Sequence, residues 1–349
     1  MEFKIQKSIY SFPHKIYGHE ALIWNNNVLV WGGTMSSSEV YFLISGNWMM
    51  KETYGEVPPN SSTHFGARAF VVNDKMLVHV LQSTYSLDLN TLTWSRLNPK
   101  GTRPPAPFNQ ISWLHKGNIY FLSNPAEVNN KIFFFNTSQN YWETHNHSGQ
   151  IPSSHSDTFS TISNDDTVFI ISFKQILIES RATKMCSGLY MLDMRRMHWI
   201  KIHNTMPDIV DSGGIWSKST FTFISNSTAV LQFGRSDYWL LDVQSAKELK
   251  KPSSIWTQIP NRFRRIQHAA VFEPKSQKLW VIGGLVLDGN YLTTSSDVLK
   301  MTFHSHDTLK ELAIDHVICN MSTDDERLLP GQLPRDLKND VELYRKYNF

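Results

Sequence analysis

Five tryptophans divide most of the chain into segments of similar length. The gaps between them are 46, 48, 57 and 57 residues, and they are Trp48, Trp94, Trp142, Trp199 and Trp256. Each tryptophan follows the same order of elements: a short apolar run, a second run that often ends in glycine, and an aromatic-rich run. A period of about 50 residues that contains several short strands is typical of a β-propeller blade, whereas helical repeats are shorter.

The first repeat shows the strand pattern most clearly. Residues 18–24, 28–33 and 40–43 are rich in β-branched and aromatic residues, and Asn, Gly and Ser separate the three runs. Such runs are typical of short strands that are joined by tight turns. Gly32 and Gly33 end the second run, where we expect a positive φ and a close approach to the neighbouring chain, which glycine tolerates.

The last two strands of each repeat are predicted to form a hairpin. Residues 88–91 supply the turn chemistry in the second repeat, because Asp and Asn side chains bond the backbone of the following residues. The same spacing of six residues separates an Asp or Asn from the tryptophan in three repeats: Asp88 and Trp94, Asn136 and Trp142, Asp193 and Trp199. In the fifth repeat, Asp242 is followed by a Lys-rich insertion at 247–254 that delays the tryptophan.

A sixth repeat runs from His268 to Met301 and has no closing tryptophan. Residues 3–6 alternate apolar and polar side chains and are the candidate for its missing strand, which would close the ring. The runs described here resemble the kelch repeat over residues 14–303, although the Gly-Gly pair survives only in repeats one and six. The predicted fold is therefore all-β: a six-bladed kelch β-propeller over residues 1–303, followed by a short α-helical C-terminal tail over 304–349.

Composition excludes several classes of protein. The net charge of +3 is small and dispersed, so we expect no nucleic-acid partner. The N-terminus has no apolar signal segment, no apolar run approaches the length of about 20 residues that spans a membrane, and two cysteines suit a reducing compartment. We expect a cytoplasmic or nuclear protein, or both, with no membrane association.

The tail changes from a strand period to a helix period. Thr308 and Glu311 form the capping-box pattern that begins a helix. Leu309, Leu312, Ala313 and Val317 then fall on one face. A polar stretch separates this helix from a second one, which begins near Pro334 and carries Leu333, Leu337 and Val341.

The two helices resemble the binding boxes of the substrate receptors of cullin–RING ubiquitin ligases. Thr308-Leu309 with the small and aliphatic positions after it resembles an elongin-binding box, although Ala313 replaces the cysteine preferred there. The second helix resembles a cullin-2 box. The resemblance implies elongin binding by Leu309, Leu312, Ala313 and Val317, and cullin-2 binding by Leu333, Pro334, Leu337 and Val341.

The combination resembles the kelch-domain-containing receptors that bind the C-terminal ends of proteins. It implies a non-catalytic substrate-recognition subunit of a cullin-2–elongin B/C ubiquitin ligase, with elongin B, elongin C, cullin-2 and substrate C-termini as partners. In these receptors an arginine after the blade-four Gly-Gly binds the terminal carboxylate, and Lys174 matches it in a loop between two strands. The candidate degron-binding residues are Lys174, Arg181, Lys184, Trp216, Ser217 and Arg235.

Other functions remain open at this point. A kelch scaffold that binds a protein partner and uses its tail only for packing is the main alternative. Residues 86–94 resemble a single sialidase Asp-box, which a structural hairpin explains equally well. The pairs His145/His147 and His304/His306 have metal-ligand spacing but no third ligand nearby. Because no nucleophile, phosphate-loop or metalloprotease motif is present, we expect no enzyme, no metal and no cofactor.

Overall fold

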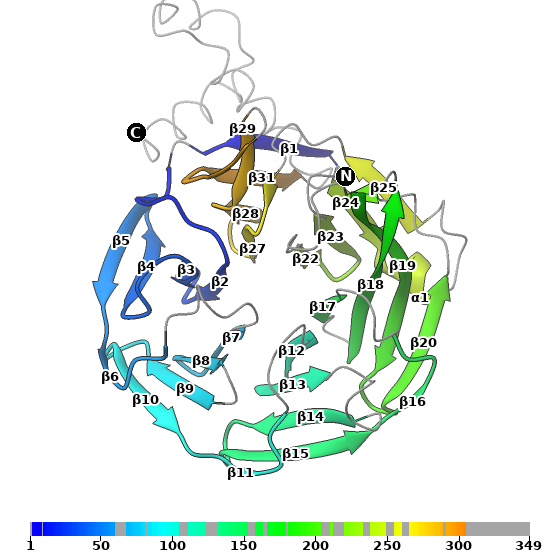
Figure 1. Cartoon of the computed structure of the whole chain (residues 1–349), viewed down its shortest axis with the longest axis horizontal. Coiled ribbons are helices and arrows are strands. Elements are labelled where there is room, and N and C mark those ends of the chain that lie inside the picture. The colour runs from blue at the N-terminus through cyan, green and yellow to red at the C-terminus, as the bar shows by residue number, and fades with distance from the viewer. Residues whose placement is uncertain are drawn as a thin grey trace, which may run out of the picture. The chain divides into compact units, whose positions relative to one another are not determined.

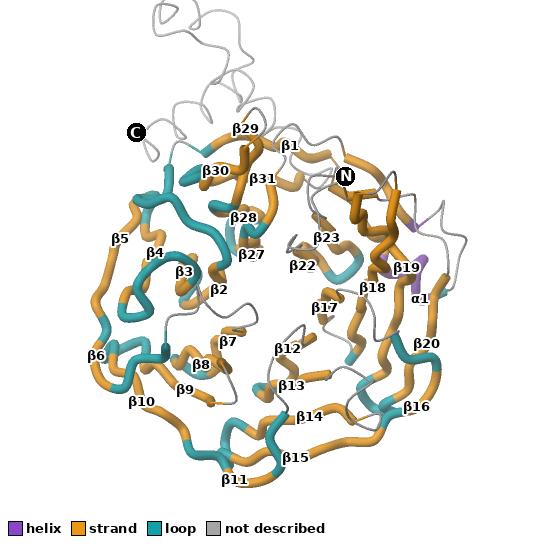
Figure 2. The backbone as a smooth tube through the Cα atoms, in the orientation of Figure 1, coloured by secondary structure: helices purple, strands orange, loops and turns teal. Residues whose placement is uncertain are grey.

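The structure is a computed structural model that describes residues 2–8, 10–59, 68–80, 83–104, 111–122, 131–152, 158–162, 166–178, 181–203, 210–211, 220–232, 238–248, 255–259, 265–288 and 291–304. The chain divides into two compact units. Unit 1 consists of Met1–Gln6 and Met301–Phe349, and unit 2 consists of Lys7–Lys300. Unit 2 is a ring of antiparallel sheets, each of which is one blade (Figures 1 and 2).

The first three blades follow the order of the sequence. Blade 1 contains β2 (His19–Trp24), β3 (Asn27–Gly32), β4 (Glu39–Ile44) and β5 (Asn47–Glu52). Blade 2 contains β7 (Arg68–Val72), β8 (Lys75–Val80), β9 (Ser83–Asp88), β10 (Thr93–Leu97) and the short β6 (Tyr54–Gly55). Blade 3 contains β12 (Ile111–His115), β13 (Asn118–Leu122), β14 (Lys131–Asn136), β15 (Tyr141–Asn146) and the short β11 (Lys100–Gly101).

Blades 4 and 5 depart from this plan by insertions. Blade 4 contains β17 (Thr158–Ile162), β18 (Thr167–Ile178), β19 (Arg181–Asp193), β20 (His198–His203) and the short β16 (Ser148–Gly149) and β21 (Val210–Asp211). Blade 5 contains β22 (Thr220–Ser225), β23 (Thr228–Gln232), β24 (Tyr238–Asp242) and β25 (Trp256–Ile259), with helix α1 (Val243–Lys247) between the last two strands.

The sixth blade contains β27 (Ala269–Glu273), β28 (Lys278–Ile282) and the first half of β31 (Val298–His304). A separate three-stranded sheet is formed by β26 (Arg265–Ile266), β29 (Leu285–Asp288) and β30 (Tyr291–Thr294). In unit 1, the described residues belong to β1 (Glu2–Lys7) and to the second half of β31, which are neighbours in strand order. The prediction of six blades is confirmed.

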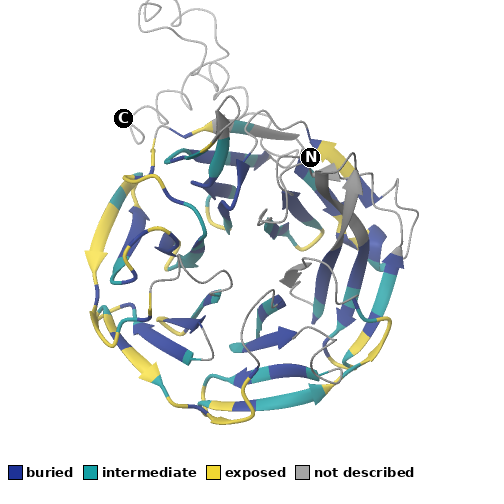
Figure 3. Ribbon diagram, viewed as in Figure 1, coloured by how far each residue is buried: buried dark blue, intermediate teal, exposed yellow. Residues whose placement is uncertain are grey.

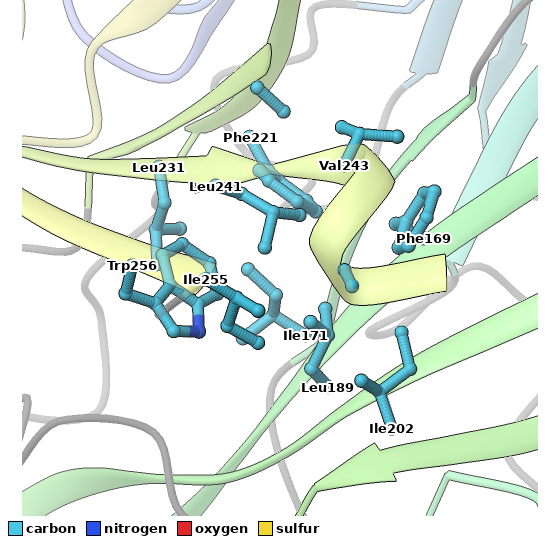
Figure 4. Close-up of a cluster of buried hydrophobic side chains, with 12 residues drawn as sticks. Phe169, Ile171, Leu189, Ile202, Phe221, Leu231, Leu241, Val243, Ile255 and Trp256 are labelled. Atoms are coloured by element: carbon cyan, nitrogen blue, oxygen red, sulfur yellow. The ribbon is translucent and has the colours of Figure 1, made fainter. Parts of the chain in front are cut away.

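The ring closes through the first strand of each blade. β2 contacts β7 and β27, β17 contacts β12 and β22, and β22 contacts β27. Side chains then fill the space between neighbouring blades. One such cluster joins Phe169, Ile171 and Leu189 of blade 4 to blade 5, including the tryptophan Trp256 (Figure 4). Burial is deepest on the second and third strands of the blades, such as β3 and β8, whereas β5 and β10 are largely exposed at the outer rim (Figure 3).

The predicted hairpin turns are present. The Asp88 carboxylate accepts hydrogen bonds from the backbone N–H groups of Asn90 (3.0 Å) and Thr91 (2.9 Å). The Asp193 carboxylate accepts from the N–H of Arg195 at 2.9 Å. In blade 5, Asp242 keeps this role as the N-cap of α1, accepting from Ser245 N at 3.0 Å. A short helix therefore occupies the start of the insertion that delays Trp256.

Short parallel strands cover the outer edges of blades 2, 3 and 4. β6 pairs with β10, β11 with β15, and β16 with β20, each next to the blade tryptophan. Each short strand ends in a glycine at positive φ: 86° at Gly55, 89° at Gly101 and 92° at Gly149. A Cβ on Gly101 would lie 2.0 Å from the Trp142 carbonyl oxygen, so only glycine fits. The linker between blades thereby becomes part of the next blade.

Gly32 and Gly33 have positive φ values of 80° and 69°, as the sequence predicts. A Cβ on Gly33 would lie 2.4 Å from the Tyr17 carbonyl oxygen, which confirms the close approach. The helical tail predicted for residues 304–349 lies outside the described residues, apart from His304 at the end of β31.

Candidate interaction rim

The second strands of the blades end at one rim of unit 2, and in blade 4 the second and third strands continue there as a β-ribbon. β18 and β19 continue to pair beyond the blade, from Phe173 opposite Cys186 to Ile178 opposite Arg181. The sequence analysis placed Lys174 in a loop between two strands, and this was wrong. Lys174 lies in β18, whereas Arg181 and Lys184 lie in β19.

The register of the β18–β19 pairing shows how the expected loop becomes a continuation of both strands. A bulge falls between Ser172 and Phe173, where the register shifts. Ser172 is fully buried, so the bulge marks the point at which the hairpin leaves the blade core. A bulge bends a strand and increases its twist, which redirects the ribbon without ending the pairing. The apolar run of β18 that follows, with Ile176, Leu177 and Ile178, supports continued strand structure.

The ribbon brings its three cations onto one hairpin. Lys174 is opposite Met185, and Lys184 is opposite Gln175 one position further along. Arg181 is opposite Ile178 at the outer end of the ribbon. Register positions therefore place Lys174 nearest the blade and Arg181 farthest from it. The other candidates, Trp216, Ser217 and Arg235, lie outside the described residues, as do the tail residues Leu309, Leu312, Ala313, Val317, Leu333, Pro334, Leu337 and Val341.

Near the same rim, blades 5 and 6 contain a buried polar group that the sequence analysis missed. The Arg265 guanidinium donates from Nη1 to the carbonyl oxygens of Gly283 (2.8 Å) and Asp297 (3.1 Å). Tyr238 is also fully buried, and desolvation raises the pKa of its hydroxyl. Burial lowers the pKa of Arg265. Arg265 thus links the two ends of the β29–β30 insertion through backbone carbonyl groups.

A charged cluster joins blades 3 and 4 at the turns between their strands. The Asp166 carboxylate accepts hydrogen bonds from Lys116 Nζ at 2.8 Å and Arg195 Nε at 2.7 Å, and His115 Nε2 lies 3.1 Å from it. The hydrogen bonds from Lys116 and Arg195 lower the pKa of Asp166 to about 2. Because His115 and Lys116 come from blade 3 while Asp166 and Arg195 come from blade 4, the cluster is an ionic link between blades.

A buried histidine has a comparable structural role between blades 2 and 3. His79 Nδ1 lies 3.1 Å from the hydroxyl of Thr84, and its ring packs against Phe121 and Trp142. Desolvation by burial, with a smaller contribution from Arg103, lowers the pKa of His79 to about 4. His79 is therefore neutral at physiological pH and fills the space between blades.

The histidine pairs do not assemble a metal site in the described part of the chain. His147 Nδ1 accepts a hydrogen bond from the indole of Trp199 at 3.1 Å, and His145 packs against Phe134. Among the described residues, no group of three His, Cys, Asp or Glu side chains is placed to hold a metal ion. His306 lies outside them. No described helix is long and apolar enough to cross a membrane.

Exposed apolar side chains are concentrated in blade 1 and in the segments directly before and after it. Five of the seven large exposed apolar residues among the described residues lie within residues 10–54: Tyr10, Ile44, Met49, Met50 and Tyr54. Unlike β10, β15 and β20, the outer strand β5 has no parallel cap strand among the described elements. The outer strand β5 therefore presents accessible apolar side chains, Met49 and Met50.

Comparison with known proteins agrees with this architecture. Residues 18–234 match the family model described as the KLHDC2/KLHL20/DRC7 Kelch-repeats domain, which is more than half of the chain. No curated protein matches at a significant level. Among solved structures, YjhT is similar over 83% of this chain and 96% of its own, with 12% identity and a TM-score of 0.57, and this likeness concerns the fold alone. The chain belongs to the kelch-repeat family of the KLHDC2/KLHL20/DRC7 type, whose propellers are protein-interaction modules and not catalytic domains.

Proposed function

We propose that this protein is the substrate-recognition subunit of a cullin-2–elongin B/C ubiquitin ligase and that its propeller binds the C-terminal ends of substrate proteins. The observation that carries the proposal is the pair of box-like segments that follows the last strand, β31. Residues 308–317 and 333–341 show the aliphatic stripes of the two boxes in the required order. A kelch-repeat propeller of the matched family precedes them.

The tail would act by helix-in-groove binding. Leu309, Leu312 and Val317 form an apolar stripe at helical spacing, which buries well in a hydrophobic groove of elongin. Leu333, Leu337 and Val341 repeat this spacing for cullin-2. Alanine at position 313 removes volume from the first stripe, so we expect elongin binding to be weaker than with cysteine there. The protein itself performs no chemistry and only positions its partner.

The blade-four ribbon supports the choice of a carboxylate ligand. Lys174, Arg181 and Lys184 fall within one hairpin, and register places Lys174 and Arg181 on one face and Lys184 on the other. Charge-assisted hydrogen bonds to a carboxylate are strong when partly desolvated. Lys174 supplies a point charge and lacks the bidentate fork of arginine, so geometric selection of the carboxylate is weaker. The ribbon therefore favours a negatively charged chain end over a neutral internal segment.

The test is co-purification of the full chain with elongin B–elongin C and cullin-2. The test variant carries Leu309→Ala, Leu333→Ala and Pro334→Ala, and the control carries Asp315→Ala and Glu342→Ala on the opposite helix faces. We expect the parent and the control to retain all three partners and the test variant to lose them with unchanged propeller unfolding. If the folded parent captures none of them, the protein is a kelch interaction scaffold.

A further inference from the structure

Blades 5 and 6 meet at a row of polar side chains that crosses three strands of blade 5. Thr220 of β22 is opposite Gln232 of β23, and Gln232 is opposite Tyr238 of β24. Residues directly opposite one another in neighbouring strands lie on the same face of a sheet, so the three side chains share one face of blade 5. The Thr220 hydroxyl lies 3.1 Å from Nε2 of His268, which directly precedes β27 of blade 6. The row therefore faces blade 6.

Arg265 lies close to this row. It belongs to β26, three residues before His268, and both Arg265 and Tyr238 are fully buried. The guanidinium and the Tyr238 hydroxyl are near enough for each to shift the pKa of the other, but the hydroxyl has no hydrogen-bond partner among the described residues. The two groups are thus buried neighbours whose polar atoms do not bond to each other.

Several polar atoms of this cluster lack a partner. Among the described residues, the buried side-chain atoms with no hydrogen-bond partner include four from three members of the cluster: the amide nitrogen and oxygen of Gln232, the hydroxyl of Tyr238 and Nε of Arg265. A buried polar atom without a partner is costly, and folded proteins satisfy most such atoms through the chain, water or a bound ion. Four of them on neighbouring side chains indicate a bound species.

The corresponding row in blade 2 contains a hydrogen bond of its own. There, Arg68 is opposite His79, and His79 is opposite Thr84. His79 and Gln232 each follow the first residue of their strand by four positions, so the two rows are equivalent. His79 Nδ1 lies 3.1 Å from the Thr84 hydroxyl and keeps one unpaired ring atom, Nε2. In blade 5, Gln232 and Tyr238 hold these two positions without a bond, so more polar atoms remain for another species.

Charge favours an anion as this species. None of the ion pairs between described residues includes Arg265, and Asp297, which attracts it, pairs its carboxylate with Lys7 Nζ at 2.7 Å. Burying a guanidinium without a counter-ion in contact is unfavourable. Three of the four unpaired atoms, Arg265 Nε, the Tyr238 hydroxyl and the Gln232 amide nitrogen, carry hydrogens that an anion can accept.

We propose that a monovalent anion of the size of chloride binds between blades 5 and 6, where it accepts hydrogen bonds from Arg265 Nε, the Tyr238 hydroxyl and the Gln232 amide. A small spherical ion suits this cluster because all three donors belong to buried side chains. Arg265 also holds the carbonyl oxygens of Gly283 and Asp297, so the ion would tie blade 5 to the base of the β29–β30 insertion. This site is separate from the ribbon and does not depend on the proposed function.

The test is thermal unfolding of the full chain in rising sodium chloride, with sodium gluconate holding the ionic strength constant because its anion is too large for a buried site. We expect the unfolding temperature of the parent to rise with chloride, since a ligand that binds the folded state stabilises it. In gluconate, Tyr238→Phe should keep or raise the unfolding temperature, because it removes an unpaired buried hydroxyl. In chloride it should unfold below the parent, with a chloride affinity lower on the order of tenfold.

Two further variants and a crystal keep the test decisive. Gln232→Met should show the same reversal between the two salts, whereas Thr84→Val, which breaks the bond to His79 in the blade-2 row, should lower the unfolding temperature equally in both. Crystals grown in sodium bromide should show an anomalous peak within hydrogen-bond reach of Tyr238 and Arg265. A parent that unfolds alike in both salts, an unaltered chloride response in Tyr238→Phe and Gln232→Met, or a water molecule in place of bromide would each overturn the anion site.

Discussion

The two halves of the β18–β19 hairpin differ sharply although they belong to the same strands. In the half nearest the blade centre, Val168, Phe169, Ile170 and Ile171 are fully buried and pack between blades 3, 4 and 5. Beyond the bulge at Ser172 and Phe173, the hairpin continues past the last described residue of β17. The same pairing of β18 with β19 thus runs from a half that packs between blades into a half that extends beyond the blade core.

This difference shows how a degenerate repeat gains a specific surface. The side chains of the first half pack against the neighbouring blades, so their volume and shape are constrained. The second half lies beyond the bulge, and its sequence contains the cations Lys174, Arg181 and Lys184. Changes in the first half should therefore cost stability, and changes in the second should cost binding.

The largest effect is expected from Phe169→Ala. Phe169 is fully buried in the cluster between blades 4 and 5 and packs near Phe223. Removing the ring leaves a cavity, which costs about 3–5 kcal/mol of unfolding free energy. Denaturant unfolding measures the loss. Ile176→Ala in the outer half is the matched comparison, with an expected cost below about 1 kcal/mol. An equal loss in both variants would contradict the division of the hairpin.

A smaller loss is expected from Gly101→Ala at the outer edge of blade 3. A Cβ there would lie 2.0 Å from the Trp142 carbonyl oxygen, and φ is 89°. The cap strand β11 would have to shift, costing about 1–3 kcal/mol. Gly117→Ala is the control, because φ is 74° but the nearest atom, Val72 Cγ1, is 3.9 Å away. If thermal unfolding shows equal losses, the contact with Trp142 contributes nothing.

Lys174 should affect binding and leave stability unchanged. We expect Lys174→Glu to lower the affinity for a free-carboxylate peptide on the order of tenfold or more. The reason is that a negative side chain there would repel the terminal carboxylate, whereas lysine attracts it. Lys174→Arg should keep or improve the affinity, since the guanidinium offers two parallel donors. Titration of the peptide as acid and as amide measures both effects. Equal affinity of Lys174→Glu and the parent would remove Lys174 from the site.

The smallest effect concerns the ionic link between blades 3 and 4. The pKa of Asp166 is lowered from 3.8 to about 2, mainly by hydrogen bonds from Lys116 and Arg195. Because the folded state holds the proton more weakly than the unfolded state, this stabilisation is present above pH 4 and lost as the pH falls toward 2. In Asp166→Asn, the unfolding temperature should depend less on pH between pH 4 and pH 2 than it does in the parent. An unchanged slope in that variant would assign the acid sensitivity to other groups.

The repeat pattern predicted the blades well because it is repeated and local. Tryptophan spacing, the Asp-initiated turns and the glycines at 32–33 each constrain a short segment, and all were found in the structure. The ribbon was missed because a long hairpin and a loop share the same start, Ser172-Phe173, and only the pairing of residues 173–178 with residues 181–186 distinguishes them. Arg265 was missed because its partners, Gly283 and Asp297, are backbone carbonyl groups, which leave no side-chain pattern.

The most direct measurement removes the outer half of the hairpin. Replacing residues 174–185 by Asn-Gly would join Phe173 to Cys186, which are already paired, through a two-residue turn. The account predicts an unfolding temperature close to that of the parent, unchanged capture of elongin B–elongin C, and loss of binding to peptides with a free C-terminal carboxylate. Retained peptide binding by this variant, or collapse of the propeller, would contradict the assignment of recognition to the ribbon and of stability to the blade.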